Sequence, residues 1–173
     1  MSKLVVVTTG PATSVQDAGR FGAQRYGLTT SGAMDRVSLA MANSLAGNAP
    51  FAAAIEIGPF SASFTARNGA VRVAVSGATR AVEIAGSPLP LNETGLIAEG
   101  ETLKLGAARD GMFSYLAIEG GIAGEPMFGS LSVNARADLG SPFPRPLQDG
   151  DALDVGTAQV APMSARWTHS ARR

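Results

Sequence analysis

The chain has 173 residues, no cysteine and a formal net charge of +0 at pH 7. The missing cysteines exclude disulfides, thiol catalysis and Cys-based metal sites, and they are typical of a cytoplasmic protein. The neutral charge favours neither nucleic acid nor an anionic membrane surface as a partner. A length of 173 residues fits one domain or two very small ones. No apolar run is long enough for a membrane span or a signal peptide, so we expect no membrane partner.

Short apolar and β-branched runs alternate with turn signals along most of the chain. The expected strands are residues 4–8, 53–57, 61–66, 71–75, 81–84, 87–91, 102–105, 113–118 and 152–155, whereas 92–98 is ambiguous. Asn68-Gly69 predicts a hairpin in which residues 71–75 are the return strand. Residues 76–79 and 109–111 are expected to be a loop and a turn. This succession predicts a mainly β fold, either a barrel or a sandwich.

Residues 13–36 combine polar, charged and glycine residues with almost no apolar periodicity. Long loops of this kind in a compact domain are usually functional or disordered, and the helix predicted directly afterwards favours function. That helix covers residues 36–45, with Asp35 as its N-cap because the carboxylate can accept from the free N–H groups of the first turn. Ser31 or Thr30 would cap it in an alternative register.

The predicted helix has an apolar stripe, and its N-terminus lies beside two arginines. The stripe consists of Val37, Ala40, Met41 and Leu45. A helix N-terminus beside Arg20 and Arg36 indicates an anion site. The structural alternative is that Asp35 is only a cap, and that Asp17 and Arg20 form an ion pair that fixes the loop.

Few catalytic motifs are compatible with this sequence. Glu56 lies between two isoleucines of a predicted strand, where an acid faces either solvent or a cavity. There is no Walker A run and no dinucleotide-binding fingerprint. The single histidine, His169, falls in residues 157–173, which are predicted to be an irregular basic tail after a domain of residues 1–156. Without a second histidine there is neither a Ser-His-Asp triad nor a zinc site, so any acid–base group must be a carboxylate, a hydroxyl or a lysine.

The run T-S-V-Q-D-A-G-R-F-G, followed by S-G-A-M-D-R and A-N-S-L-A-G-N, resembles the opening of the allophanate hydrolase subunit 2 family. That family forms the second half of the carboxyltransferase domain of urea carboxylase. It includes the C subunits of bacterial 5-oxoprolinases and KipA-type regulators. The resemblance continues through residues 54–57, 75–78, 105–111 and 119–122. The joint pattern Q-D-x-G-R and S-G-A-M-D makes it specific.

The resemblance implies a cyclophilin-like β-barrel with one short helix, and a subunit 1 (KipI-like) partner near the active site. The positions implied to be catalytic are Asp17, Asp35 and Arg20. Those implied to bind substrate are Gln16, Ser31, Met34, Arg36, Glu56, Ser76 and Ser130, and no metal site is implied.

Family members also carry a second half similar to the first. This chain has no such half, so we expect a site shared between halves to be incomplete here. The family also has a run of glycines that ends in an arginine near the end of this half. Residues 140–145 occupy that place here, and Arg145 is the basic residue that they retain.

Three functions are compatible with the resemblance. The first is that of the C subunit of a bacterial ATP-dependent 5-oxoprolinase, which converts 5-oxoproline to glutamate; arginines would offset charge on phosphate or on the substrate carboxylate. The second is carboxyl transfer from carboxybiotin to urea or another amide. The third is a non-catalytic KipA-type regulator that binds a kinase inhibitor. We expect the first, because an unfused chain favours it.

Overall fold

The computed structural model describes residues 1–156, and the predicted tail lies outside them. The elements in chain order are β1 Lys3–Thr8, β2 Ser14–Gln16, the 3-10 turn η1 Gln24–Tyr26, α1 Arg36–Leu45, β3 Ala54–Ile57, β4 Ala62–Arg67, β5 Val71–Thr79, β6 Val82–Ile84, β7 Ser87–Pro88, β8 Thr94–Ile97, β9 Thr102–Leu105, β10 Asp110–Ile118 and β11 Ala152–Asp154. No helix within residues 1–156 has the length and apolar character needed to cross a membrane.

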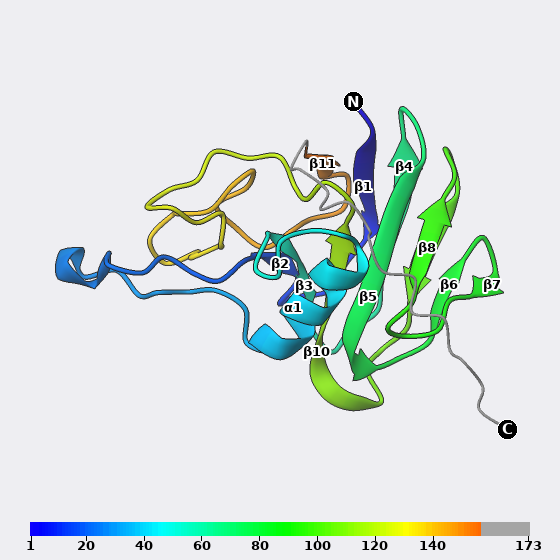
Figure 1. Ribbon diagram of the computed structural model, residues 1–173, viewed down its shortest axis with the longest axis horizontal. Coiled ribbons are helices and arrows are strands. Elements are labelled where there is room, and N and C mark those ends of the chain that lie inside the picture. The colour runs from blue at the N-terminus through cyan, green and yellow to red at the C-terminus, as the bar shows by residue number, and fades with distance from the viewer. Residues whose placement is uncertain (157–173) are drawn as a thin grey trace, which may run out of the picture.

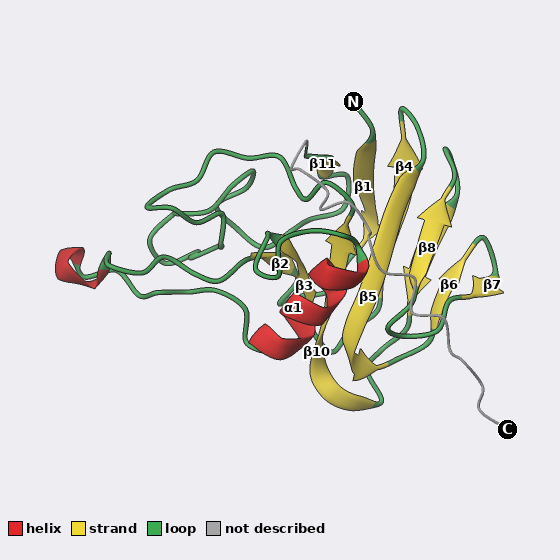
Figure 2. Ribbon diagram, in the orientation of Figure 1, coloured by secondary structure: helices red, strands yellow, loops and turns green. Residues whose placement is uncertain are grey.

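Residues 1–156 contain two antiparallel sheets (Figures 1 and 2). An apolar core formed by buried side chains of both sheets lies between them. The six-stranded sheet has the order β11-β1-β4-β9-β6-β7, and the five-stranded sheet the order β2-β3-β10-β5-β8. Alternate residues of each strand point into the core, as Phe64 and Leu103 do from one sheet and Ile55 and Leu116 from the other. For residues 1–156, the prediction of a mainly β fold with one α-helix is confirmed.

The predicted hairpin at Asn68-Gly69 is wrong in one respect. The dipeptide does turn the chain, with φ of 58° at Asn68 and 126° at Gly69. The strands on either side belong to different sheets, however: β4 pairs with β1 and β9, and β5 pairs with β10 and β8. Positive φ values fix a reversal of the chain but not the pairing beyond it, because here both strands bury apolar side chains between the sheets.

Two predicted loops are parts of long strands. Residues 76–79 continue β5, and Asp110-Gly111 belong to β10. The pairing of these two strands is irregular between Asp110 and Ser114. Gly77 lies opposite this irregularity with φ of 113°, and a Cβ there would lie 2.6 Å from the carbonyl oxygen of Phe113. Small and turn-forming residues therefore mark a bulge in this part of the sheet.

Helix α1 has the predicted bounds, and Asp35 is its N-cap, as predicted. The buried face differs from the predicted stripe: Leu39, Ala42 and Ala46 pack on the outer face of the five-stranded sheet. Val37 and Met41 are exposed instead. Alanines on the sheet below let the helix approach closely, so small residues and Leu39 make this contact.

The two asparagines of the A-N-S-L-A-G-N run hold the end of α1 against the sheet. Asn48 donates to the backbone carbonyl of Ile118 at 2.7 Å and to the side-chain oxygen of Asn43 at 3.0 Å. Asn43 in turn donates to the carbonyl of Ala52 at 2.8 Å. These buried amides satisfy backbone groups that the helix end and strand end leave free, so this motif is structural.

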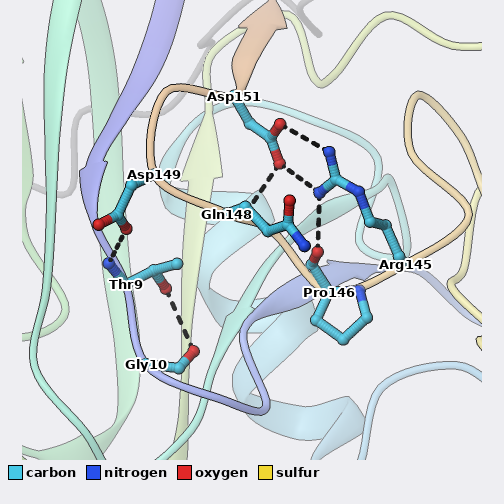
Figure 3. A network of polar contacts seen from close by, with 7 residues as sticks. All are labelled: Thr9, Gly10, Arg145, Pro146, Gln148, Asp149 and Asp151. Carbon is cyan, nitrogen blue, oxygen red and sulfur yellow. Dashed lines mark hydrogen bonds and ion pairs between the residues drawn. The ribbon is translucent and has the colours of Figure 1, made fainter.

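The turn before β11 is tied back to β1 (Figure 3). Asp149 accepts a hydrogen bond from the N–H of Thr9 at 2.9 Å. Arg145 makes a bidentate contact with Asp151 at 2.7 and 2.9 Å, and the N–H of Gln148 donates to the same carboxylate. The bond from Arg145 lowers the pKa of Asp151 below its ordinary value. Arg145 thus fixes a turn within its own segment.

Two long excursions leave the sheets on the same side and form what we call the arm (Figure 1). The first limb is residues 17–33, with η1 at its tip, and the second is residues 124–146. The rings of Tyr26 and Phe128 join the limbs, with centroids 5.9 Å apart, and Asn134 donates to the Thr29 hydroxyl at 3.1 Å. The arm is built from irregular backbone, so side-chain and backbone hydrogen bonds between the limbs must hold it together.

The two faces of α1 predict different costs of substitution. We expect Leu39→Ala to lower the free energy of unfolding by about 2–5 kcal/mol, because the side chain is fully buried and a cavity would remain. The matched control is Val37→Ala, at a side chain that is 74% exposed, and should change it by less than about 0.5 kcal/mol. Urea denaturation measures both, and equal losses would contradict the observed orientation of the helix.

Candidate functional site

A cavity of 610 Å³ lies between the two limbs of the arm and the edge of the five-stranded sheet. Its lining residues are Gln16, Gly27, Leu28, Thr29, Ser31, Gly32, Met34, Glu56, Val133, Asn134, Ala135, Arg136 and Ala137. Four of the predicted substrate-binding residues, Gln16, Ser31, Met34 and Glu56, therefore meet at one place. They come from β2, the first limb, the segment before α1 and β3, so the cavity exists only when the arm is folded.

The neck of the arm depends on two glycines that face each other. Gly19 and Gly32 have φ of 95° and 93°. A Cβ on Gly19 would lie 2.7 Å from the carbonyl oxygen of Ser31, and one on Gly32 would lie 2.9 Å from Ala18. Only glycine fits both the dihedral angles and this close approach of the two backbone segments. This explains the glycines of the Q-D-A-G-R and S-G-A-M-D runs.

Asp17 joins the two limbs. Its carboxylate accepts bonds from the hydroxyls of Ser130 and Ser132, both at 2.6 Å, and from the N–H groups of Leu131 and Gly19, both at 2.7 Å. Its own N–H donates to Ser132 at 2.9 Å. All of these donors are neutral groups of the protein, so the carboxylate is occupied by structural bonds. Ser130 supports Asp17 rather than facing the cavity.

Arg20 is buried behind the cavity wall. The side chain is 0% exposed, and its Nη2 donates to the backbone carbonyl of Ser132. Its Nε and Nη1 have no hydrogen-bond partner among the described residues. Burial lowers the pKa of Arg20, while the nearby Asp17 carboxylate acts in the opposite direction. Arg20 does not line the cavity, and among the described residues its guanidinium makes no hydrogen bond to the first turn of α1.

A row of polar side chains crosses the outer face of the five-stranded sheet. Ser14, Glu56, Tyr115 and Ser76 are register partners on β2, β3, β10 and β5. Glu56 and Tyr115 are bonded at 2.7 Å, with the Tyr115 hydroxyl donating to Oε2. Ser76 lies at the far end, where it donates to Asn92 at 2.8 Å and does not line the cavity.

The Glu56–Tyr115 pair fixes the segment that leads into α1. Glu56 Oε2 also accepts from the N–H of Met34 at 2.8 Å, and the Tyr115 hydroxyl accepts from the N–H of Asp35 at 2.7 Å. Two consecutive backbone N–H groups are thereby satisfied by side chains of the sheet. Glu56 Oε1 makes no hydrogen bond among the described residues, and Glu56 lines the cavity. One carboxyl oxygen is thus structural and the other is free.

The surroundings of Glu56 shift the pKa of its carboxyl upward, toward neutral pH. Glu56 is only 6% exposed. Burial raises the pKa of Glu56, although the bonds from Met34 and Tyr115 act in the opposite direction. Burial likewise raises the pKa of Tyr115 above its ordinary value, so the tyrosine stays protonated and donates. A carboxyl of this kind can hold or release a proton nearer to neutral pH than an ordinary glutamate.

Gln16 places a second acceptor at the same cavity. Its amide nitrogen donates to the Ser14 hydroxyl at 2.9 Å and to the carbonyl of Val133 at 3.4 Å. Its Oε1 is buried and has no partner among the described residues. A buried amide oxygen without a donor is costly, so a donor from a bound molecule would relieve it.

Asp35 and Arg36 lie outside the cavity. Asp35 accepts from the N–H groups of Val37 and Ser38 and from the Ser38 hydroxyl. The Ser38 bond lowers the pKa of Asp35. The first turn of α1 is therefore capped by the protein's own carboxylate, and it does not form the expected anion site with Arg20. Asp35 and Met34 line a second cavity of 470 Å³ at the β5–β10 bulge.

Arg36 forms part of the outer surface. Its guanidinium lies over the rings of Phe21 and Phe51, 5.5 and 4.9 Å from their centroids, and donates to the carbonyl of Ala18. It connects the arm to α1.

Tyr115, Ser132 and Arg136 also contribute to the site, and none of them was predicted from the sequence to do so. Tyr115 could have been noticed as a polar aromatic in an apolar strand, but its partner Glu56 depends on which strands pair. Ser132 belongs to the small polar run beside Ser130. Arg136 carried no signal in the sequence, because only the folding of the second limb brings it to the cavity.

Comparisons with known proteins agree on one family. The family described as carboxyltransferase domain, subdomain A and B, matches residues 26–173. The 5-oxoprolinase C subunit of Haemophilus influenzae is 32% identical over 85% of this chain and 47% of its own length. That of Escherichia coli is 33% identical over 94% of this chain and 52% of its own length. This chain therefore spans about half the length of these curated relatives.

A solved structure shares the fold. The crystal structure of the K. lactis urea amidolyase superposes with a TM-score of 0.84 at 33% identity, covering 88% of this chain and 9% of that chain.

Asp17→Asn should weaken the arm. The substitution keeps the size of the side chain but replaces one acceptor oxygen by an NH₂ group that faces donors. We expect the free energy of unfolding to fall by about 1–3 kcal/mol and proteolytic cleavage within residues 124–146 to become faster. The control is Asp138→Asn, at an exposed residue of the same limb. Urea denaturation and limited proteolysis measure the effects, and unchanged cleavage would contradict a joining role for Asp17.

The environment of Glu56 predicts a pH dependence of stability. Because its pKa is raised on folding from 4.5, the protonated form favours the folded state. Relative to Glu56→Gln, the unmodified protein should lose stability as the pH rises from below 4.5 through the raised pKa, and then level off. Urea denaturation of both proteins at a series of pH values isolates this group, since all other groups are shared. A difference that grows in favour of the unmodified protein would refute it.

Proposed function

This chain belongs to the carboxyltransferase domain family, subdomains A and B, and on that premise we propose that it acts as the C subunit of an ATP-dependent 5-oxoprolinase. Two relatives with this name, at 32% and 33% identity, support the proposal. The observation that carries it is Glu56, a buried carboxyl with one free oxygen at a cavity that other polar groups line.

The chemistry of the reaction suits such a carboxyl. Opening the ring of 5-oxoproline breaks the bond between the carbonyl carbon and nitrogen, adds the oxygen of water to the carbon and leaves a proton on the nitrogen. Glu56 can deliver this proton or accept one from the attacking water, because its raised pKa brings it closer to neutral pH. Tyr115 keeps the carboxyl in place by donating to its other oxygen.

The residues predicted to be catalytic have positioning roles in this proposal. Asp17 joins the limbs, Arg20 packs behind them, and Asp35 caps α1 while its N–H is held by Tyr115. Each supports a wall of the cavity, and none of the three lines it. The acid–base role passes to Glu56, and Gln16, Ser31 and Met34 keep the substrate-binding role.

ATP supplies the driving force for opening a stable amide in such an enzyme. The anion site expected at the N-terminus of α1 does not fit a nucleotide phosphate, because the first N–H groups of α1 are taken by Asp35 and Arg20 is buried. We therefore assign ATP to a partner subunit.

An exposed apolar surface of α1 and its surroundings is the proposed contact with that partner, a subunit 1 (KipI-like) protein. Met34 and Val37 are 72% and 74% exposed. Three further large apolar side chains are exposed: Met41 on α1, Phe21 in the first limb of the arm and Phe51 in the segment after α1. Large apolar side chains gathered around one helix are typical of surfaces that another protein covers. This surface adjoins the cavity through Met34, so the partner would close the site.

The second candidate is carboxyl transfer from carboxybiotin to urea or another amide. It is favoured by the structural likeness to the K. lactis urea amidolyase. Urea also has N–H donors for the free oxygens of Gln16 and Glu56. The two functions differ in whether turnover requires carboxybiotin or ATP with 5-oxoproline.

The decisive experiment is ATP turnover by this chain assembled with its partner subunits, with and without 5-oxoproline. We expect stimulation by 5-oxoproline, and we expect Glu56→Gln to reduce the stimulated rate by about 100-fold or more, a typical loss for a general acid or base. The matched control is Glu93→Gln, at an exposed glutamate that does not line the cavity.

Each outcome has a clear meaning. A stable complex without stimulation would refute the oxoprolinase function, and a carboxybiotin assay would then separate urea carboxylation from a purely regulatory role. Stimulation that survives in Glu56→Gln would remove Glu56 from the chemistry while leaving the function in place.

A further inference from the structure

Among the described residues that line the cavity, Arg136 supplies the only cationic side chain. It lies on the second limb and is exposed. Within residues 1–156 no hydrogen bond or ion pair engages its guanidinium, whereas the two arginines of the first limb are held: Arg20 by a backbone carbonyl and Arg25 over the ring of Tyr26. An unpaired guanidinium at the mouth of a cavity offers a fork of donors that matches a carboxylate.

The floor of the cavity has the opposite character. Gln16 Oε1 is a buried acceptor without a donor among the described residues. The hydrogen bonds that Glu56 receives within residues 1–156 go to Oε2, which leaves Oε1 without a donor there. Both residues are more than nine-tenths buried. These two side chains come from the same face of adjacent strands, since Ser14 is the register partner of Glu56 and Gln16 follows two positions later. They can take N–H groups from a bound molecule, and an acid here repels a carboxylate.

The cavity is therefore polarised from floor to mouth. An N–H group belongs at the floor and a carboxylate at the mouth, so a molecule that carries both has one favoured orientation. A neutral amide satisfies only the floor. This difference separates 5-oxoproline, which has a ring N–H and a carboxylate, from urea, which has no carboxylate.

We infer that Arg136 is a specificity-determining residue, which selects amides bearing a carboxylate over neutral amides, while Gln16 and Glu56 read the amide N–H. The inference rests on the proposed function and deepens it, because it assigns to one residue the choice between the two candidate substrates. It does not require Arg136 to take part in bond breaking. Its effect belongs to binding, and hence to the KM.

Binding to three probes tests this assignment: 5-oxoproline, 2-pyrrolidinone, which is the same ring without the carboxylate, and urea. We expect Arg136→Gln to weaken 5-oxoproline binding about 10-fold or more. The substitution removes the charged hydrogen bond between the guanidinium and the carboxylate of 5-oxoproline, and the loss of such a bond typically has an effect of this size. Binding of 2-pyrrolidinone should not change. Gln16→Met should weaken both lactams by a similar factor. Arg25→Gln, at an arginine of the same arm that does not line the cavity, is the matched control.

The same variants are then measured in the assembled enzyme, where Arg136→Gln should raise the KM for 5-oxoproline and leave kcat unchanged. Higher salt should weaken binding of 5-oxoproline but not of 2-pyrrolidinone. Equal effects of Arg136→Gln on both lactams, or tighter binding of urea than of 5-oxoproline, would overturn the inference. So would the absence of 5-oxoproline binding in both the chain and the assembly.

The two proposals can fail separately. Loss of carboxylate selection with intact ATP turnover on 5-oxoproline would refute the role of Arg136 alone. Intact selection in the binding assay without stimulated ATP turnover would refute the oxoprolinase function alone.

Discussion

The hydrogen bonds to the Asp17 carboxylate are the interaction on which the rest of the site depends. Two irregular limbs, more than a hundred positions apart in the chain, converge on this one side chain through Ser130, Leu131 and Ser132. In the part of the chain that the structure describes, no strand pairing connects the limbs. The walls of the cavity therefore exist because one anion gathers donors from both sides, and the glycines at Gly19 and Gly32 allow the backbone to come close enough.

The five-stranded sheet separates stability from chemistry on its two faces. Its inner face carries Ile55, Leu116 and similar side chains into the main core. Its outer face carries the polar row around Glu56 and Tyr115, partly covered by α1 and bordered by the arm. A buried carboxyl is tolerated there because one oxygen receives two hydrogen bonds. The other oxygen receives no hydrogen bond within residues 1–156, and Glu56 lines the cavity, so the same side chain both supports the fold and offers a reactive group.

Most charged residues of the motif segment 13–36 stabilise the structure and do not line the cavity. Asp17 and Asp35 receive donors from the protein itself, and Arg36 lies over two aromatic rings. The groups left free within residues 1–156 include those of Glu56, Gln16 and Arg136, which are separated in the sequence and less noticeable. A motif can thus mark a site by building its walls, while residues from other segments provide the polar atoms that a ligand meets.

The sequence by itself determined the features that depend on near neighbours. The bounds of α1, its cap at Asp35 and the reversal at Asn68-Gly69 follow from interactions within a few residues, and the mainly β class follows from alternating apolar runs. Only the tertiary structure decided which strands pair, which face of α1 is buried, and that Glu56 meets Tyr115 from 59 positions away. Those outcomes depend on packing between distant segments, where one residue pattern is compatible with several partners. Arg136 reaches the cavity for the same reason, because the fold of the second limb sets its place.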